Sequence, residues 1–384
     1  MPSTTTRAIA VGNRIRLSAT EAAYCAELER IVGLAAPHLA PGRPNLICLT
    51  EMLGLPVALT GGRAALARRA PTSTLALGLL AAAYQAEVRA ARRRWPGISL
   101  ARALLLARAD ALYRPFARTL SRLAHRHHAH IVATTLAPRL AGALSLADNT
   151  PGQVEAAGPE IYNAALVFGP DGSLLGRVDK VYLTHGEIAS LDLTAGALED
   201  VRVIPTEAGR LGVAISLDAF TPDYLRRLDS LGAQIVVQPD ANDQPWAAPS
   251  ALCDWQPREW QDSTLGSIQP RYPHLRYNIC AMQTGAFFEV VFDGQSSVTS
   301  RDAAPPSGPA GRYIGVDEWR DSHTGEWFSG GFLGLAPWVT PDPVVREPWL
   351  TLAQRRARLA TTGRALRPED YRESVIWADL DLEG

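Results

Sequence analysis

The segment "GRLGVAISLDAFTPDYLRRLDSLGAQIVVQPDAN", residues 209–242, predicts a strand, a helix and a second strand in direct succession. "GVAISL" and "QIVVQPDA" are short apolar runs typical of buried strands, and "TPDYLRRLDSLGA" between them has a helical pattern. Strands that alternate with helices indicate an α/β protein. Ser216 and Asp218 close the first run, so polar side chains stand where a buried strand ends.

The same alternation extends outward over most of the chain. Residues 7–17 and 44–51 predict strands, and a helix with capping-box spacing between Ser18 and Glu21 lies between them. Further predicted elements are a helix at 112–128, a strand at 130–138, a hairpin at 161–183 with its turn at 169–172, a strand pair at 201–217 with its turn at Gly209–Arg210, a basic helix at 349–366 and a last strand at 373–382. We expect an α/β fold with a largely buried sheet, in one domain spanning residues 1–384, with a C-terminal extension from about residue 300.

The composition argues against several classes of protein. A net charge of −1 with 47% hydrophobic residues indicates a globular protein with ample core and no nucleic acid partner. The four cysteines are far apart without a CxxC pair, so we expect no disulfide or metal framework and a cytoplasmic location. We expect neither a signal peptide nor a transmembrane helix, because the N-terminus lacks an apolar core and no apolar run is long enough.

A basic helical insertion at about residues 60–126 interrupts the alternation. It contains 13 arginines against only Glu87 and Asp110, which leaves this segment at +11 and the rest of the chain at −12. A solvated insertion or an oligomer contact is the favoured interpretation, and a surface for an acidic partner or an anionic membrane is the alternative. The run "HRHHAH" at 125–130 resembles a metal site, but no carboxylate or cysteine lies at ligand spacing, so no metal is expected.

Lys180, in "GRVDKVYLTHGE" at residues 176–187, is the only lysine beside 37 arginines. Arginine supplies surface charge and ion pairs as well as lysine does, but its charge is spread over a planar fork. A compact ammonium near a reacting atom requires lysine. Together with Glu51 and Ser216, each at the end of an apolar strand, Lys180 forms a plausible set for acyl transfer.

These residues and their order resemble the nitrilase (carbon–nitrogen hydrolase) superfamily from about residue 7 to residue 300, with a weaker similarity in the final strand. Glu51 in "LTEMLGLP" matches the general base, Lys180 the catalytic lysine, and Glu187 in "HGE" the second glutamate, which orients substrate and lysine. The segment 209–242 matches the nucleophile elbow with its following helix and strand. The basic insertion is longer than the family pattern.

The departure from the family is Ser216, which occupies the position of the cysteine nucleophile. Cys48 is no substitute, because it lies three residues from Glu51 on the same strand and should face the opposite way. A thiol ionises beside an ammonium, whereas a serine hydroxyl needs a well-placed base throughout the attack. Three explanations stay open: a variant that traps substrate, a natural pseudoenzyme, or a natural serine hydrolase. The retained Glu51, Lys180 and Glu187 favour the first.

The resemblance implies an α-β-β-α sandwich that associates into a larger sandwich when the protein dimerises. It implies hydrolysis of an amide or nitrile without metal or organic cofactor, with the backbone N–H of Leu217 and Lys180 holding the developing negative charge. A non-catalytic binding or scaffold protein is the alternative. Weak candidates for a substrate pocket are Asn242 and Trp246, with Trp255, Trp260 and Tyr272 nearby, although such side chains more often serve packing.

Overall fold

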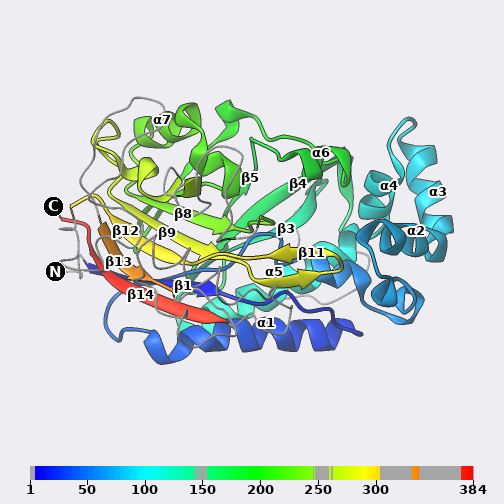
Figure 1. The fold of residues 1–384 in the computed structure, drawn as a ribbon, viewed down its shortest axis with the longest axis horizontal. Helices are drawn as coiled ribbons and strands as arrows, with labels where there is room; N and C mark the ends of the chain where they lie inside the picture. The colour runs from blue at the N-terminus through cyan, green and yellow to red at the C-terminus, as the bar shows by residue number, and fades with distance from the viewer. Residues whose placement is uncertain are drawn as a thin grey trace, which may run out of the picture.

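The computed structural model describes residues 5–142, 146, 154–244, 246, 259–260, 263–302, 331–336 and 373–383. Two six-stranded sheets form its centre (Figure 1). The first has the order β14-β1-β2-β3-β4-β5, and the second has the order β13-β12-β9-β8-β7-β6. The strands of the first sheet are β14 (Ser374–Asp381), β1 (Thr5–Gly12), β2 (Asn45–Cys48), β3 (His130–Leu140), β4 (Ala156–Phe168) and β5 (Leu174–Asp179). Those of the second are β13 (Gly331–Leu335), β12 (Ser297–Ser300), β9 (Tyr277–Met282), β8 (Ile235–Asp240), β7 (Gly209–Val213) and β6 (Val203–Thr206).

Each sheet has a parallel centre and antiparallel flanks. In the first, β1, β2 and β3 run parallel, and in the second β7, β8 and β9 run parallel. The predicted hairpin is confirmed as β4 and β5, with Gly172 in the left-handed region at φ 83°. The predicted strand pair is also confirmed, but its turn lies at Glu207–Ala208, because Thr206 already pairs with Gly209. Parallel strands place their carboxyl ends at one edge, and this edge gathers the polar residues described below.

The two sheets face each other across an apolar core to which β2 contributes Leu46 and Cys48 and β8 contributes Ile235 and Val237. Successive side chains of a strand alternate between faces, so Ile47 packs on the opposite side, among the helices. Cys48 is 0% exposed in this core and burial raises the pKa of its thiol, as suits a structural cysteine.

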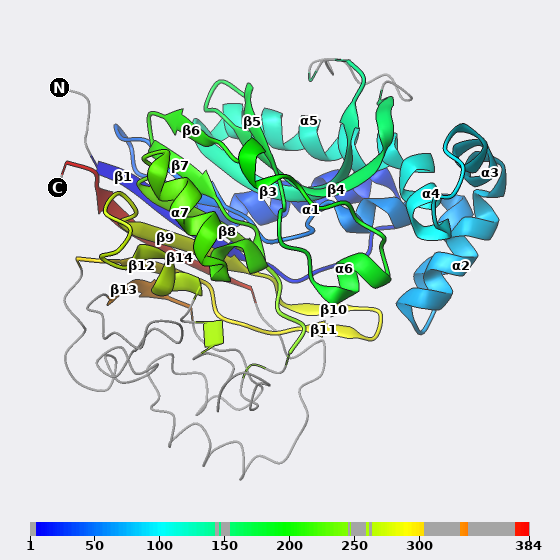
Figure 2. The same cartoon turned by 90° about the horizontal axis from the view of Figure 1, so that it is seen from above.

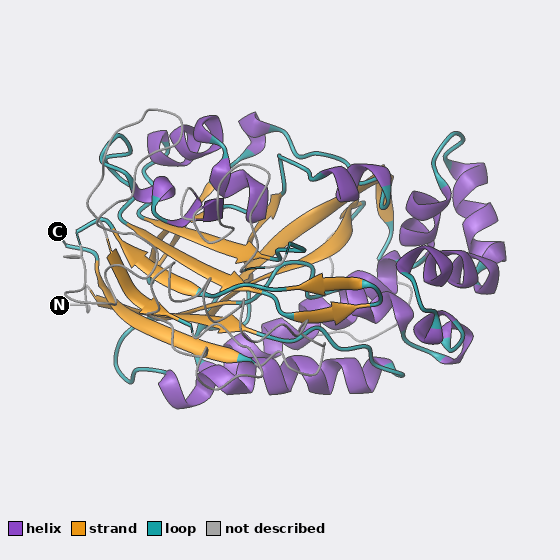
Figure 3. Cartoon of the chain, in the orientation of Figure 1, coloured by secondary structure: helices purple, strands orange, loops and turns teal. Residues whose placement is uncertain are grey.

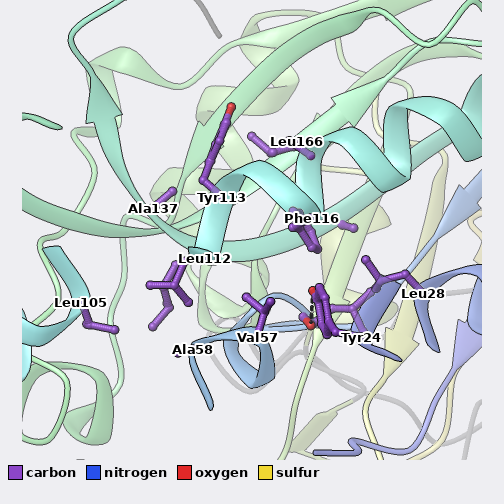
Figure 4. Packing of buried hydrophobic residues seen from close by; sticks show 14 of the residues in the cluster. Tyr24, Leu28, Val57, Ala58, Leu105, Leu112, Tyr113, Phe116, Ala137 and Leu166 are labelled. Carbon is purple, nitrogen blue, oxygen red and sulfur yellow. Dashed lines mark hydrogen bonds between the residues drawn. The ribbon is translucent and has the colours of Figure 1, made fainter. Parts of the chain in front are cut away.

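Helices cover both outer faces. α1 (Glu21–Ala35) and α5 (Ala109–His127) pack on the first sheet, and α7 (Pro222–Ser230) packs on the second (Figure 2). Figure 4 shows the first of these layers, where Tyr24 and Leu28 of α1 meet Phe116 of α5. Figure 3 shows helices on both sides of the strands. The expected α-β-β-α sandwich is therefore confirmed.

The helical segment expected at about 60–126 divides into two parts. α5 is a layer of the sandwich, buried along one face against β3 and β4. The helices before it, α2 (Ser73–Ala83), α3 (Gln85–Arg94) and α4 (Leu100–Ala107), lie together at one end of the molecule (Figure 1). The short helices η2 (Leu55–Leu59), η3 (Gly62–Ala64) and η4 (Ala67–Arg69) lead into them. We therefore place the end of the inserted helices near residue 108, and we call α2, α3 and α4 the inserted helices below.

The small hairpin of β10 (Gly285–Phe287) and β11 (Val290–Phe292) extends toward these helices (Figure 2). The predicted last strand is confirmed as β14, antiparallel to β1. The predicted basic helix at 349–366 and Trp255 lie outside the described residues. Across the part that is described, no helix is long and apolar enough to cross a membrane.

Candidate active site

Lys180 lies between two glutamates at the buried end of the first sheet. Its Nζ is 2.7 Å from Oε1 of Glu51 and 2.8 Å from Oε2 of Glu187. Glu51 follows β2, Lys180 is the first residue after β5, and Glu187 belongs to α6 (His185–Ala189). All three side chains are at most 4% exposed. The structure thus brings together three of the predicted site residues, although Glu51 and Lys180 are 129 residues apart in the chain.

Asn163 on β4 joins the same cluster, and sequence reasoning missed it. Its Nδ2 donates to Oε1 of Glu51 and to Oε1 of Glu187, both at 2.8 Å. Thr184 holds Glu187 from the other side through a reciprocal capping box, in which the N–H of Thr184 donates to Oε2 of Glu187 at 2.8 Å. The one available signal for Asn163 was an amide within the otherwise apolar strand "IYNAALVF".

Burial and neighbouring charges shift the pKa values of Glu51, Glu187 and Lys180 by different routes. Burial raises the pKa of Glu51 to about 8, because the nearby Glu187 and Asp240 charges add to it and Lys180 offsets only part of it. Burial acts on Glu187 in the same direction, but Lys180 and the Thr184 and Asn163 hydrogen bonds outweigh it and lower the pKa of that group. Burial alone would lower the pKa of Lys180, yet the two carboxylates raise it. These shifts favour an ammonium at Lys180 and an ionised Glu187, and they leave Glu51 as the carboxylate best suited to exchange a proton.

Ser216 lies on a strained turn between β7 and α7. Its φ of 48° places a non-glycine residue in the left-handed region, which is common where a nucleophile is presented at a sharp turn. Asp218 in the same turn is fully buried and fixes it to the chain after Lys180. Its Oδ1 accepts from the N–H groups of Val181 at 3.1 Å and Tyr182 at 2.8 Å. Burial raises the pKa of Asp218 to about 7, although these hydrogen bonds act against it.

Asp240, the last residue of β8, is the second group that sequence reasoning missed. Gln238 Nε2 donates to its Oδ2 at 2.8 Å. Burial raises the pKa of Asp240, and the neighbouring side chains of Gln238 and Ser216 act against that rise. Gln238 is held in turn by Asn278 Nδ2 at 2.8 Å, and all these groups are buried. The backbone N–H of Glu51 donates to the Asp240 carbonyl at 3.3 Å, so Asp240 connects the elbow to the lysine cluster. A polar residue directly after an apolar strand, "QIVVQPD", was the available signal.

The candidate pocket residues have partners within the protein. Trp246 is 1% exposed, donates from Nε1 to Oε1 of Gln295 at 2.7 Å and stacks edge-on against Trp260 at 5.1 Å. Asn242 Nδ2 donates to the carbonyl of Asp293 at 2.9 Å. These contacts fix the loop after β8, and a role in binding substrate stays a prediction.

The backbone N–H of Leu217 follows Ser216 directly on the elbow, and its role as an oxyanion donor is likewise still a prediction. Within the described residues, no group of three or more histidines, cysteines or acidic residues is arranged to hold a metal ion.

The chain has relatives of known fold. The sequence pattern of the family described as "Carbon-nitrogen hydrolase" matches residues 56–303, well over half of the chain, including Lys180, Glu187 and Ser216. No curated protein sequence matches. A carbon-nitrogen hydrolase from Helicobacter pylori G27 is similar in structure, with a TM-score of 0.51 and 15% identity over 77% of this chain and 82% of that one.

Two further solved structures are similar at lower scores. One is Nit3 from Saccharomyces cerevisiae, a member of branch 10 of the nitrilase superfamily, with 16% identity over 78% of this chain and 83% of that one at a TM-score of 0.47. The other is an amidase from Nesterenkonia sp., with 16% identity over 94% of this chain and 96% of that one at a TM-score of 0.46. At 15% identity the Helicobacter pylori structure supports the fold alone, and the family assignment rests on the match over residues 56–303. The chain belongs to the carbon-nitrogen hydrolase family.

Proposed function

We propose that the protein hydrolyses a non-peptide carbon–nitrogen bond in an amide or nitrile. The observation that carries this proposal is the buried ammonium of Lys180, held at 2.7 and 2.8 Å between Glu51 and Glu187. A buried ion cluster is costly to maintain and contributes little to stability by itself. Perturbed carboxylates beside a strained elbow are instead typical of a catalytic site.

In the proposed reaction on an amide, the hydroxyl oxygen of Ser216 attacks the carbonyl carbon. Glu51 takes the hydroxyl proton and delivers it to the leaving nitrogen, so that ammonia or an amine departs and an acyl-enzyme remains. Lys180 and the N–H of Leu217 stabilise the negative charge on the carbonyl oxygen. Water then attacks the ester, with Glu51 taking its proton, and the acid is released as Ser216 regains its hydrogen.

Asp240 bears on the question of why residue 216 is serine. The Asp240 carboxylate lies near enough to the Ser216 side chain for each to affect the other. We infer that this carboxylate orients and activates the hydroxyl by accepting a hydrogen bond from it. The same carboxylate beside a thiol would oppose thiolate formation, since like charges disfavour ionisation. This environment supports a natural serine nucleophile, and not a serine substituted into a site that was built for a thiolate. The retained Glu51, Lys180 and Glu187, taken alone, favoured the other explanation, a variant that traps substrate.

Two related expectations accompany the proposal. We propose a homodimer formed through the helices near the elbow, as in the family that the sequence resembles, and we propose no cofactor. The alternative function is a pseudoenzyme that binds small molecules or acts as a scaffold.

The test is ammonia release from a panel of amides and nitriles by the unchanged chain and by Ser216→Ala. Release by the first and not by the second supports the proposal. Substrate binding by both without release would favour the pseudoenzyme.

A further inference from the structure

An apolar pocket of about 370 Å³ lies between the sandwich and the inserted helices. Leu77 and Leu80 of α2 and Leu104 of α4 form one wall, and Leu59 and Phe288 contribute from the sandwich side. Its volume falls within the ~300–1,000 Å³ of small-molecule sites, which are mostly apolar with few polar groups.

The pocket shares two chain segments with the candidate active site. η2, which begins four residues after Glu51, contributes Leu55 to the lining. The segment 189–191, which begins two residues after Glu187, also lines it. A ligand in this pocket would therefore contact chain segments that follow closely after Glu51 and Glu187.

The inserted helices are fastened on both sides of this pocket. At the start of α2, the N–H and hydroxyl of Ser73 donate to Glu289, in the β10–β11 turn, at 2.6 and 2.7 Å. From α4, Arg102 Nη2 donates to Oδ1 of Asp192, just after α6, at 2.8 Å. The wall that these helices supply is thus held in place by polar contacts outside the apolar lining.

Among the described residues, one cation at the pocket, Arg108, has no ion-pair partner. Its Nη2 donates to the Thr60 carbonyl at 3.4 Å, whereas its buried Nε has no hydrogen-bond partner among the described residues. Its guanidinium stacks on the ring of Tyr84 at 4.4 Å. A buried, unsatisfied guanidinium N–H is unfavourable until an acceptor reaches it, and a carboxylate is the acceptor that matches its geometry.

We propose that this pocket binds the apolar chain of the substrate, and that Arg108 binds an anionic group, a carboxylate, on the same molecule. The inference rests on the proposed function for its link to catalysis, and it names the substrate class: amides or nitriles with a hydrocarbon body and a carboxylate. The inserted helices are then the specificity element of the enzyme.

The test measures binding directly, on the full chain with Ser216 in place. Alkanoates from butyrate to decanoate, and the matching neutral alkanamides, displace dansyl-labelled undecanoic acid, followed by fluorescence. Each added methylene should tighten binding about three- to fourfold, as expected for apolar burial. Arg108→Gln should weaken the alkanoates by about tenfold and leave the alkanamides unchanged, and Arg89→Gln on the exposed face of α3 is the control.

Filling the pocket separates specific binding from surface adsorption. Ala76→Phe, at a buried lining position of α2, should abolish the dependence on chain length, whereas Leu75→Phe at its exposed neighbour should preserve it. Affinity that does not depend on chain length in the unchanged protein, or that survives Ala76→Phe, overturns the inference.

Hydrolysis of short amides without this chain-length dependence would reject the pocket alone. Chain-length-dependent binding without hydrolysis of any amide would reject the proposed function alone.

Discussion

The site cluster and the inserted helices use ionic groups in opposite ways. In the site, Lys180 and its two glutamates are at most 4% exposed and depend on one another for their charge. On the inserted helix α3, Glu87 pairs with Arg63 of η3 and Arg94 pairs with Glu155, with side chains 40–64% exposed. The second group is largely solvated, whereas the first is almost fully buried. A change of one charge should therefore be severe in the site and mild in the inserted helices.

The largest loss of turnover from a single substitution is expected at Lys180, inside the buried cluster. Lys180→Arg keeps the charge, but the wider guanidinium does not fit the space between Glu51 and Glu187. Loss of one oxyanion donor typically costs on the order of 10²–10³ in kcat, and steady-state kinetics on a short amide measures it. The matched control is Arg122→Lys, a swap of the same pair of residue types at a surface position 46% exposed. Near-full turnover in Lys180→Arg would remove the role assigned to the lone lysine.

The second prediction concerns the charge beside residue 216. A Ser216→Cys thiol should react slowly with iodoacetamide, because Asp240 disfavours the thiolate. Adding Asp240→Asn removes that charge, and a shift of one pKa unit in the thiol corresponds to about tenfold faster labelling. Circular dichroism of both proteins controls for folding. Equal labelling rates would mean that Asp240 does not act on residue 216.

The third prediction is a pH dependence set by Glu51. A general base must be ionised, and burial raises the pKa of Glu51 to about 8. Below that value the ionised fraction falls, so kcat/KM should rise about tenfold per pH unit and level off near pH 8. Circular dichroism over the same range separates this from unfolding. A level profile from neutral pH to about 9 would contradict Glu51 as the base.

The smallest effect is expected where an inserted helix is fastened by a partly exposed pair. Arg102→Gln removes the contact with Asp192, whose side chain is 36% exposed. Such pairs contribute about 0–1 kcal/mol, so the melting temperature should fall by no more than a few degrees, with turnover of a short amide unchanged. Arg94→Gln, at a more exposed pair, should have still less effect. A large loss of turnover in Arg102→Gln would show that α4 supports the chemistry itself.

The same contrast explains what the sequence could predict. Lys180, Glu51 and Glu187 were predictable because each sits in a local motif, and the β4–β5 hairpin because its turn residues are adjacent. Asn163 and Asp240 act through partners 112 and 24 residues away, and their contacts depend on strand register and on which face each side chain takes. Single-sequence patterns do not contain that information.

The extent of the insertion was equally hidden from the sequence. α5 carries the same arginine-rich composition as the helices before it, yet it is a buried layer of the sandwich. Composition alone does not show whether one face of a helix is buried against a sheet, and the exposed arginines of α5 resemble those of α2 to α4. Only packing against β3 and β4 distinguishes the two regions.

The central claim is that the Lys180 cluster and Ser216 form a working carbon–nitrogen hydrolase site. Its most direct test is ammonia release from amides by three proteins side by side: the unchanged chain, Ser216→Ala and Ser216→Cys. We expect steady release by the unchanged chain, none above background by Ser216→Ala, and no gain in Ser216→Cys because Asp240 opposes its thiolate. An inert unchanged chain beside an active Ser216→Cys would contradict it, since the site would then be built for a thiolate.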